Sequence, residues 1–348
     1  MKAFLMHRDR DFDAAAALPT QASELTQDLG LTVLFNTMAA RDPFLLEIAK
    51  VGIFGSLQDV AAIRYRQAVL RDCLANPTIV RGMYALVVET IEKEKTHYWG
   101  LSSRNPGSIL YRSTELLKLF VDALRRLRRI AEEHGASFQS EGFVTLFAML
   151  RRELDESYLA TVEEHVERLK FRHGPLISAR LAPGIAGQDL VLRKPNRDDR
   201  FWFQRLLGPR RHSYSFRLHE RDEAGGRILG EIKDRGLSLV ANAAGQAVDH
   251  IVSFMRMLRV ELAFYVAGLN LHDRLTAAGG PICFPEPCPA GERRHRARGL
   301  YDACLALVSG AAPSSATSSP RTGRSSLSSQ APTKAVNPPG CEPSALPS

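Results

Sequence analysis

Residues 244–274 read AGQAVDHIVSFMRMLRVELAFYVAGLNLHDR and contain the longest regular pattern in the chain. Apolar side chains recur there at alternating intervals of three and four residues, the spacing of one face of an α-helix. The positions are Val248, Ile251, Met255, Leu258, Leu262, Tyr265 and Leu269. A helix of this length would be about 45 Å long, and it needs an equally long neighbour to bury its stripe. The sequence therefore predicts a mainly α protein built around a long helical arm.

Two further stripes upstream of this helix have the same spacing. The first consists of Leu117, Phe120, Leu124, Leu127 and Ala131, and the second of Phe143, Leu146, Leu150, Leu154, Tyr158, Val162, Val166 and Leu169. They predict amphipathic helices, the second interrupted by a bend. Four arginines lie around the first stripe: Arg125, Arg126, Arg128 and Arg129. We interpret them as a solvated helix surface, with a DNA contact as the alternative.

The period of the pattern changes between the bend and the long helix. Residues 175–181, 189–193 and 214–218 are short, partly alternating runs separated by Gly and Pro, which predicts strands of a small sheet. Residues 172–221 also hold eleven Lys or Arg against four Asp or Glu, a net charge of +7. The whole chain has a net charge of +8, so nearly all of the excess lies in this segment. Such a local positive field favours a polyanion.

The candidate binding residues lie within this basic segment, interleaved with Trp202 and Phe203. They are Arg193, Lys194, Arg197, Arg200, Arg205, Arg210 and Arg211. Guanidinium and ammonium groups on a surface that follows a nucleic-acid backbone neutralise phosphates, whereas sequence reading would need groups directed at base edges. The prediction is phosphate contact only, and the alternative is a basic solvated loop.

Composition excludes several classes of protein. With 348 residues, 45% hydrophobic and 24% charged, the chain can bury a core, unlike a disordered or collagen-like chain. It has no apolar run of the roughly 18–20 residues that a membrane span needs and no apolar signal core behind Met1. Five cysteines, unevenly spaced, fit a reducing compartment. We therefore expect a cytoplasmic protein without membrane contact.

Motifs for metal binding and catalysis are incomplete. Asp9–Asp13 has the opening spacing of a calcium loop, but Ala14 and Thr20 stand where glycine and glutamate belong. Cys283 and Cys288 lack a second ligand pair for zinc. The sequence contains no Gly-x-x-x-x-Gly-Lys-Ser/Thr loop and no convincing nucleophile with a base. We expect no catalytic residue, metal or cofactor site in this chain, which would then not be an enzyme.

Several stretches along the chain resemble one family. They are Met1-Lys-Ala-Phe-Leu-Met-His-Arg-Asp-Arg-Asp-Phe-Asp13, His97-Tyr-Trp-Gly100, Phe147-Ala-Met-Leu-Arg-Arg-Glu-Leu154, Leu192-Arg-Lys-Pro195, Glu261-Leu-Ala-Phe-Tyr-Val266, Gly291-Glu-Arg-Arg-His295 and Gly299-Leu-Tyr-Asp302. In this order they resemble the bacterial MutS-like DNA mismatch-repair family, over roughly residues 1–308. The resemblance implies a helical core and lever, a small clamp on the DNA backbone, and a C-terminal ABC-type ATPase domain. For full-length members it implies ATP, Mg²⁺ and a homodimer. We expect no counterpart in this chain of the mismatch-reading domain of MutS proper, with its Phe-x-Glu wedge.

The end of the chain departs from that family. From Ser309 onward the composition is rich in Ser and Pro with little that is apolar, which predicts a disordered tail. In a shifted reading frame, Gln330 to Pro339 can encode Gly-Ala-Asn-Gln-Gly-Gly-Lys-Ser-Thr, a phosphate-binding loop of the MutS type. We hypothesise a frameshift between about Leu307 and Ser314 that truncates the ATPase domain, and sequencing the gene tests it directly.

These inferences combine into one domain organisation. We expect a mainly α fold with a long-helix lever and core bundle, a small basic β insertion, the start of an α/β ATPase domain and a disordered tail. The divisions are a helical core (1–109), ascending lever helices (110–171), a small basic β clamp-like unit (172–221), a long return helix (222–276), an ATPase stub (277–308) and the tail (309–348). The expected function is contact with the backbone of double-stranded DNA in repair or recombination, with ATPase function lost. The alternative is a helical protein-interaction scaffold without DNA affinity.

Overall fold

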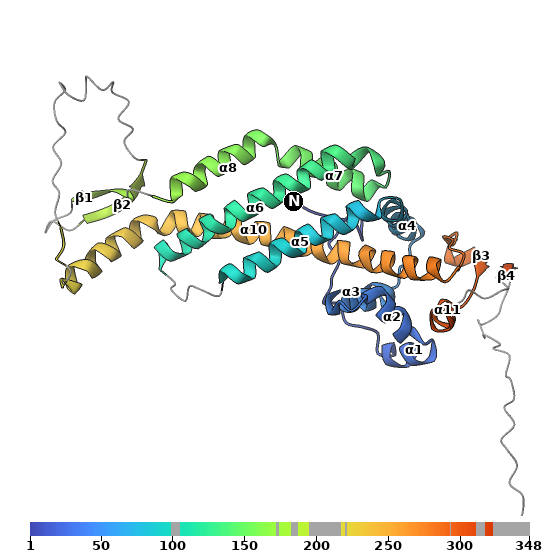
Figure 1. The fold of residues 1–348 in the computed structure, drawn as a ribbon. Helices are drawn as coiled ribbons and strands as arrows, with labels where there is room; N and C mark the ends of the chain where they lie inside the picture. Colours follow the sequence, from blue (N-terminus) through green and yellow to red (C-terminus); the bar gives the residue numbers. More distant parts are fainter. Residues whose placement is uncertain are drawn as a thin grey trace, which may run out of the picture.

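A computed structural model describes residues 1–98, 105–171, 174–181, 187–194, 217–219, 221–292, 294–310 and 317–322. The chain is mainly helical with small β elements, as the sequence predicts (Figure 1). The α-helices are α1 (Ala22–Asp28), α2 (Leu31–Ala39), α3 (Pro43–Phe54), α4 (Val60–Ala75), α5 (Pro77–Tyr98), α6 (Pro106–His134), α7 (Glu141–Glu153), α8 (Glu156–Leu169), α10 (Glu223–Ala277) and α11 (Ala303–Ser309). The strands are β1 (Leu176–Leu181), β2 (Gly187–Arg193), β3 (Arg294–Leu300) and β4 (Thr317–Thr322), and two short 3₁₀ turns are η1 (Gly135–Ser137) and η2 (Ala290–Glu292). None of the helices described is long and apolar enough to cross a bilayer.

Helix α10 is the axis of the molecule and runs through nearly its whole length (Figure 1). It has 55 residues, which corresponds to about 80 Å. Its apolar stripe is buried as expected from Val248 to Leu269, apart from the half-buried Ile251. The helix begins at Glu223, about 25 residues before the stripe starts at Val248. The Asp222 side chain caps its first turn by accepting a hydrogen bond from the Gly225 N–H.

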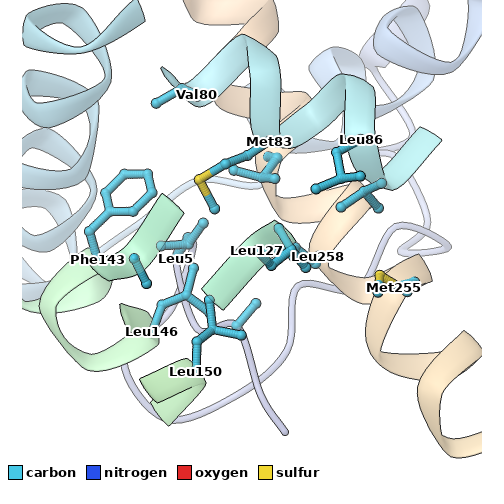
Figure 2. Close-up of a cluster of buried hydrophobic side chains, with 14 of the residues drawn as sticks. Leu5, Val80, Met83, Leu86, Leu127, Phe143, Leu146, Leu150, Met255 and Leu258 are labelled. Atoms are coloured by element: carbon cyan, nitrogen blue, oxygen red, sulfur yellow. The ribbon is translucent and has the colours of Figure 1, made fainter. Parts of the chain in front are cut away.

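The main core lies where α4, α5, α6 and α7 meet the C-terminal half of α10. Figure 2 shows Met83 and Leu86 of α5, Leu127 of α6, Leu146 of α7 and Leu258 of α10 in one buried cluster. Leu5 from the N-terminal segment packs among them. The five residues of the first stripe on α6 are all buried, so the helical period identified this face correctly.

A second, smaller core lies along the arm. It joins the first half of α6 to the middle of α10, with one residue from α8, and we call it the lever cluster. It consists of Leu110, Leu116, Leu117, Phe120, Val166, Leu237, Ala241, Ala244, Val248 and Val252. Four of its five α10 members are alanines or valines, whose small side chains let α6 and α10 approach closely here.

The bend expected in the third stripe lies between α7 and α8. Helix α7 ends at Glu153, Leu154 is buried, and α8 begins at Glu156. Tyr158 does not continue the stripe, because it is 55% exposed and the neighbouring Leu159 is buried instead. The interruption changes the phase of the helix, so the prediction for Tyr158 is wrong.

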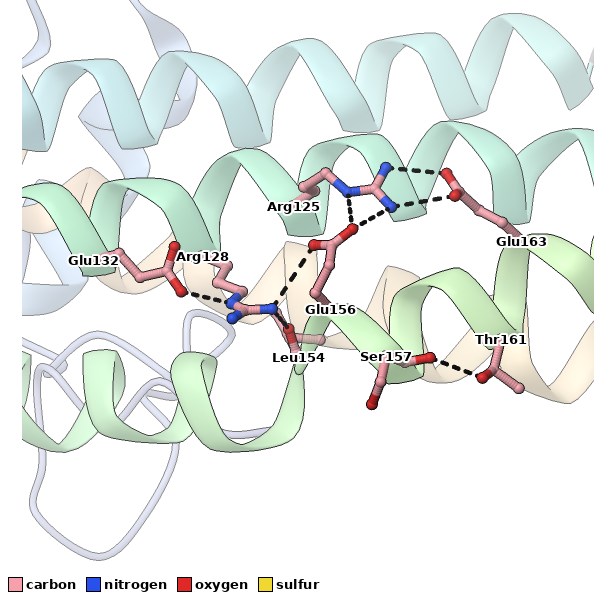
Figure 3. A network of polar contacts seen from close by, with 8 residues as sticks. All are labelled: Arg125, Arg128, Glu132, Leu154, Glu156, Ser157, Thr161 and Glu163. Carbon is pink, nitrogen blue, oxygen red and sulfur yellow. Dashed lines mark hydrogen bonds and ion pairs between the residues drawn. The ribbon is translucent and has the colours of Figure 1, made fainter.

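A network of ion pairs fixes α8 beside α6 (Figure 3). The Arg125 guanidinium donates to the Glu163 carboxylate at 3.0 and 3.2 Å and to Glu156 at 3.2 Å. Arg128 donates to Glu132 and to the Leu154 carbonyl, both at 2.9 Å. These two arginines are half-buried and hold helices together, so they form neither the solvated surface that the sequence predicts nor a free DNA contact.

Strands β1 and β2 form an antiparallel hairpin, with Leu176 opposite Arg193 and Ile177 opposite Leu192. Figure 1 shows this hairpin at the end of the arm remote from α1–α4. The third strand expected, residues 214–218, lies partly outside the described residues. Its described part, Arg217 and Leu218, is not in a strand, and Leu218 instead packs on the first turn of α10 beside Gly225.

The C-terminal part of the chain adds a second antiparallel pair, β3 with β4. Strand β4 lies in the segment for which the Ser/Pro composition predicts disorder, so that prediction is wrong for residues 317–322. Backbone groups of β3 provide hydrogen-bond partners whatever the side chains of the pairing segment are. The rest of the expected tail, residues 311–316 and 323–348, lies outside the described residues, and 303–309 form helix α11.

Candidate nucleic-acid interface

The hairpin is fixed to α10 through its apolar face. Leu192 of β2 packs against the lever cluster. Ile177 of β1 lies over Gly236 of α10, so closely that a Cβ added at this glycine would be only 2.6 Å from the Ile177 Cδ1. Glycine is therefore required at the point where the hairpin crosses the helix. This close contact sets the position of the hairpin on the arm.

Arg193 and Lys194 lie at the end of β2 and both are exposed. The Arg193 Nε donates to the Ser178 Oγ at 2.9 Å, across the hairpin from β1. The Ser178 hydroxyl in turn donates to the Val191 carbonyl at 3.4 Å. Neither cation forms an ion pair with another described residue. The hydroxyl orients the guanidinium without neutralising it, so both charges face solvent.

A third cation of the hairpin is neutralised. Arg180 of β1 lies 3.6 Å from the Asp189 carboxylate of β2, and both side chains are well exposed. Such an exposed pair is weak, about 1 kcal/mol or less, and is screened by salt. It could open when a phosphate competes for Arg180, but in the free protein it lowers the charge on this side of the hairpin.

The remaining candidate residues of the basic segment cannot be placed. Arg197, Arg200, Arg205, Arg210 and Arg211 lie outside the described residues, as do Trp202 and Phe203. Of the seven predicted residues, the structure therefore places only Arg193 and Lys194, which it brings together at the end of one strand.

Two other basic residues belong to this end of the arm. Arg217 and Arg221 are exposed beside the start of α10. Both lie in the basic segment, yet the candidate set stops at Arg211, because a single sequence does not show that the chain returns to the arm there. The contact between Leu218 and the Gly225 turn is what places Arg217. The sequence signal that could have added Arg217 and Arg221 to the candidate set is the excess of positive charge over residues 172–221.

The described residues offer no site for a metal, since nowhere among them do three His, Cys, Asp or Glu side chains come together as a ligand set. Cys283 is exposed and Cys288 half-buried. The candidate interface is thus a hairpin surface on which cations outnumber the single described carboxylate, Asp189, and what it can do chemically is bind anions.

The fold and the site define the class of this protein: it is a helical-arm protein, in which one long helix carries a cationic hairpin at the end remote from the core. Residues 58–278 match the family model described as the MutS2 N-terminal domain. The match spans more than half of the chain, from just before α4 to the end of α10, and the chain belongs to this family. No curated protein and no solved structure matches the chain.

Proposed function

We propose that the β1–β2 hairpin and the start of α10 bind the phosphate backbone of double-stranded DNA. The observation that carries the proposal is the pair of exposed cations, Arg193 and Lys194, on a hairpin that Gly236 and Leu192 fix at the end of the arm. Exposed cations without a carboxylate partner among the described residues release counterions from DNA at little cost. The family membership supports the proposal, because the MutS resemblance implies a clamp at this place in the chain.

The test is a filter-binding salt series with a DNA duplex. Each phosphate contact contributes about 0.9 to the slope of log affinity against log salt. The double variant Arg193→Ala/Lys194→Ala should bind more weakly and lower the slope by about 2. The matched control is Arg64→Ala/Arg152→Ala, which removes two exposed cations of α4 and α7 and should leave the slope unchanged.

Two outcomes would count against the proposal. If the wild-type chain binds no DNA at low salt, the clamp assignment fails. If both double variants weaken binding equally, only net charge matters and the hairpin is not the interface. A protein partner retained in pull-downs after nuclease treatment, together with no DNA affinity, would favour the interaction scaffold instead.

The proposal does not include nucleotide turnover by this chain. Its sequence contains no Gly-x-x-x-x-Gly-Lys-Ser/Thr loop, and such a loop supplies the backbone N–H groups and the lysine that hold nucleotide phosphates. We expect no ATP hydrolysis by the purified chain, with or without DNA, in a phosphate-release assay. ATP, Mg²⁺, homodimer formation and a cytoplasmic location stay predictions that rest on the family resemblance and on composition.

A further inference from the structure

A cavity of about 820 Å³ lies between α5, α6 and α10, away from the hairpin. Apolar side chains from two of these helices line it, among them Leu116 of α6 and Val248 and Val252 of α10. Glu94 of α5 and Arg256 of α10 contribute charged groups to the same lining. An apolar lining with a few polar groups, in a volume of about 300–1,000 Å³, is typical of small-molecule sites.

Glu94 is the unusual member of this lining. Its side chain is only 9% exposed, and its Oε2 accepts no hydrogen bond from any described residue. The Arg256 Nη2 forms an ion pair with this oxygen at 3.5 Å, from a side chain that is 61% exposed. Native proteins satisfy nearly all buried polar atoms, so a buried carboxylate oxygen without a donor is one that a ligand can satisfy.

The chemistry of the lining favours a cationic ligand over an anionic one. Three described cations line the cavity, and none of them is free: Lys95 has the Glu92 Oε1 at 2.9 Å, Arg256 faces Glu94, and Arg112 is also engaged. An anion would meet the carboxylates of Glu94 and Asp249, which also lines the cavity. An ammonium group would instead give Glu94 charge-assisted hydrogen bonds, which are stronger than neutral ones.

We propose that this cavity binds a small apolar amine. The ammonium group donates to the Glu94 carboxylate, and the apolar body of the ligand packs on Leu116, Val248 and Val252. The site is independent of the DNA interface, because none of its residues belongs to the hairpin or to the basic segment.

Titration calorimetry with phenethylamine tests the proposal, with 2-phenylethanol as the uncharged match. The full chain should bind one equivalent of the amine and bind the alcohol at least tenfold more weakly. The variant Glu94→Gln keeps the size of the side chain but removes its charge, and it should lose at least tenfold in amine affinity. Glu89→Gln, an exposed carboxylate of the same helix outside the cavity, should bind like the wild type.

A second pair of variants tests the location of the amine site without changing any charged residue. A Cβ at Gly245, which lines the cavity, would meet only Ile109 at 4.0 Å, so Gly245→Leu should fill the cavity and abolish binding while α10 keeps its helix. Gly230→Leu is the matched control, since nothing lies within 4 Å of its Cβ position. The proposal is overturned if the wild type binds no amine, if the alcohol binds equally well, or if Glu94→Gln or Gly245→Leu retains full affinity in a folded protein.

Discussion

Glu261 shows how a single buried carboxylate organises a distant segment. It lies on α10, is fully buried, and accepts hydrogen bonds from the N–H groups of Leu5, Met6 and Phe12. The nearby Tyr265 hydroxyl donates to the Leu5 carbonyl at 2.6 Å. Burial raises the pKa of Glu261 above its usual 4.5, although the three N–H donors oppose that shift. The N-terminal segment is thus held through its backbone by two side chains of one helix.

This arrangement predicts a pH-dependent contribution of Glu261 to stability. Because the folded state binds the proton more tightly, the contribution is fully present below about pH 4.5 and decreases as pH rises through the raised pKa. Glu261→Gln should be less stable by about 2–3 kcal/mol at pH 4.5, since its amide turns an N–H toward backbone donors. Urea unfolding at a series of pH values should show that the difference in unfolding free energy between Glu261→Gln and the wild type becomes smaller above pH 4.5.

The control for that experiment is Tyr265→Phe, which removes a hydrogen bond to the same segment. Burial raises the pKa of Tyr265 well above 10, so its phenol does not titrate between pH 4.5 and 8. The difference in unfolding free energy between Tyr265→Phe and the wild type should therefore stay constant over this range. A gap for Glu261→Gln that widens with pH would contradict the raised pKa.

Asp72 has a comparable role within the main core. Its buried carboxylate accepts hydrogen bonds from the N–H groups of Gln139, at 3.0 Å, and Ser140, at 2.7 Å, just before α7. Asp72→Ala leaves both donors without a partner and should cost about 2–4 kcal/mol of unfolding free energy. Asp59→Ala, which removes the exposed cap of α4, should cost only about 1 kcal/mol. If both variants lost the same unfolding free energy in chemical denaturation, burial would not strengthen the hydrogen bonds that Asp72 accepts.

At the scale of elements, the hairpin depends on its contact with α10. Gly236→Val would place side-chain carbon against Ile177, whose three nearest atoms lie 2.6–3.1 Å from the added Cβ. We expect the hairpin to be displaced and DNA affinity to fall several-fold, although no charge is removed. Circular dichroism should show the helices intact, because Gly is itself an unfavourable residue in a helix. Unchanged affinity in this variant would indicate that the position of the hairpin on α10 is not needed for binding.

At the scale of the whole molecule, α10 joins the main core to the lever cluster. The lever cluster is smaller than the main core, and two of its members are alanines, so we expect the arm to open at a lower free energy than the rest. Phe120, only 1% exposed, is its largest member, and Phe120→Ala should cost about 3–5 kcal/mol.

Hydrogen exchange can show which helices lose stability in the Phe120→Ala variant. Amides of α8 and of the first half of α10 should exchange faster in Phe120→Ala, while those of α4 and α7 keep their protection. The matched change in the main core, Leu127→Ala, should instead raise exchange throughout the helices. Uniform acceleration in both variants would mean that the two cores unfold as one unit.

The sequence by itself determined which faces of α6 and α10 are buried. The stripes on α6 and α10 lie in the core as their spacing predicts, because the helical period is a local property that each segment carries with it. The sequence also located the excess of positive charge in one segment, since charge is counted without knowing the fold.

Only the tertiary structure decided which charges remain exposed and which are paired. Arg125 and Arg128 resemble Arg193 and Lys194 in the sequence, yet the first two face carboxylates of α8 and α6, and the latter two face solvent. The tertiary structure also decided the partners of Glu261, which lies more than 240 residues from the backbone groups it binds. It likewise decided the pairing of β4, which acquires its structure from β3. Pairing is a relation between segments far apart in the chain, and its energy depends on distances that exist only after folding.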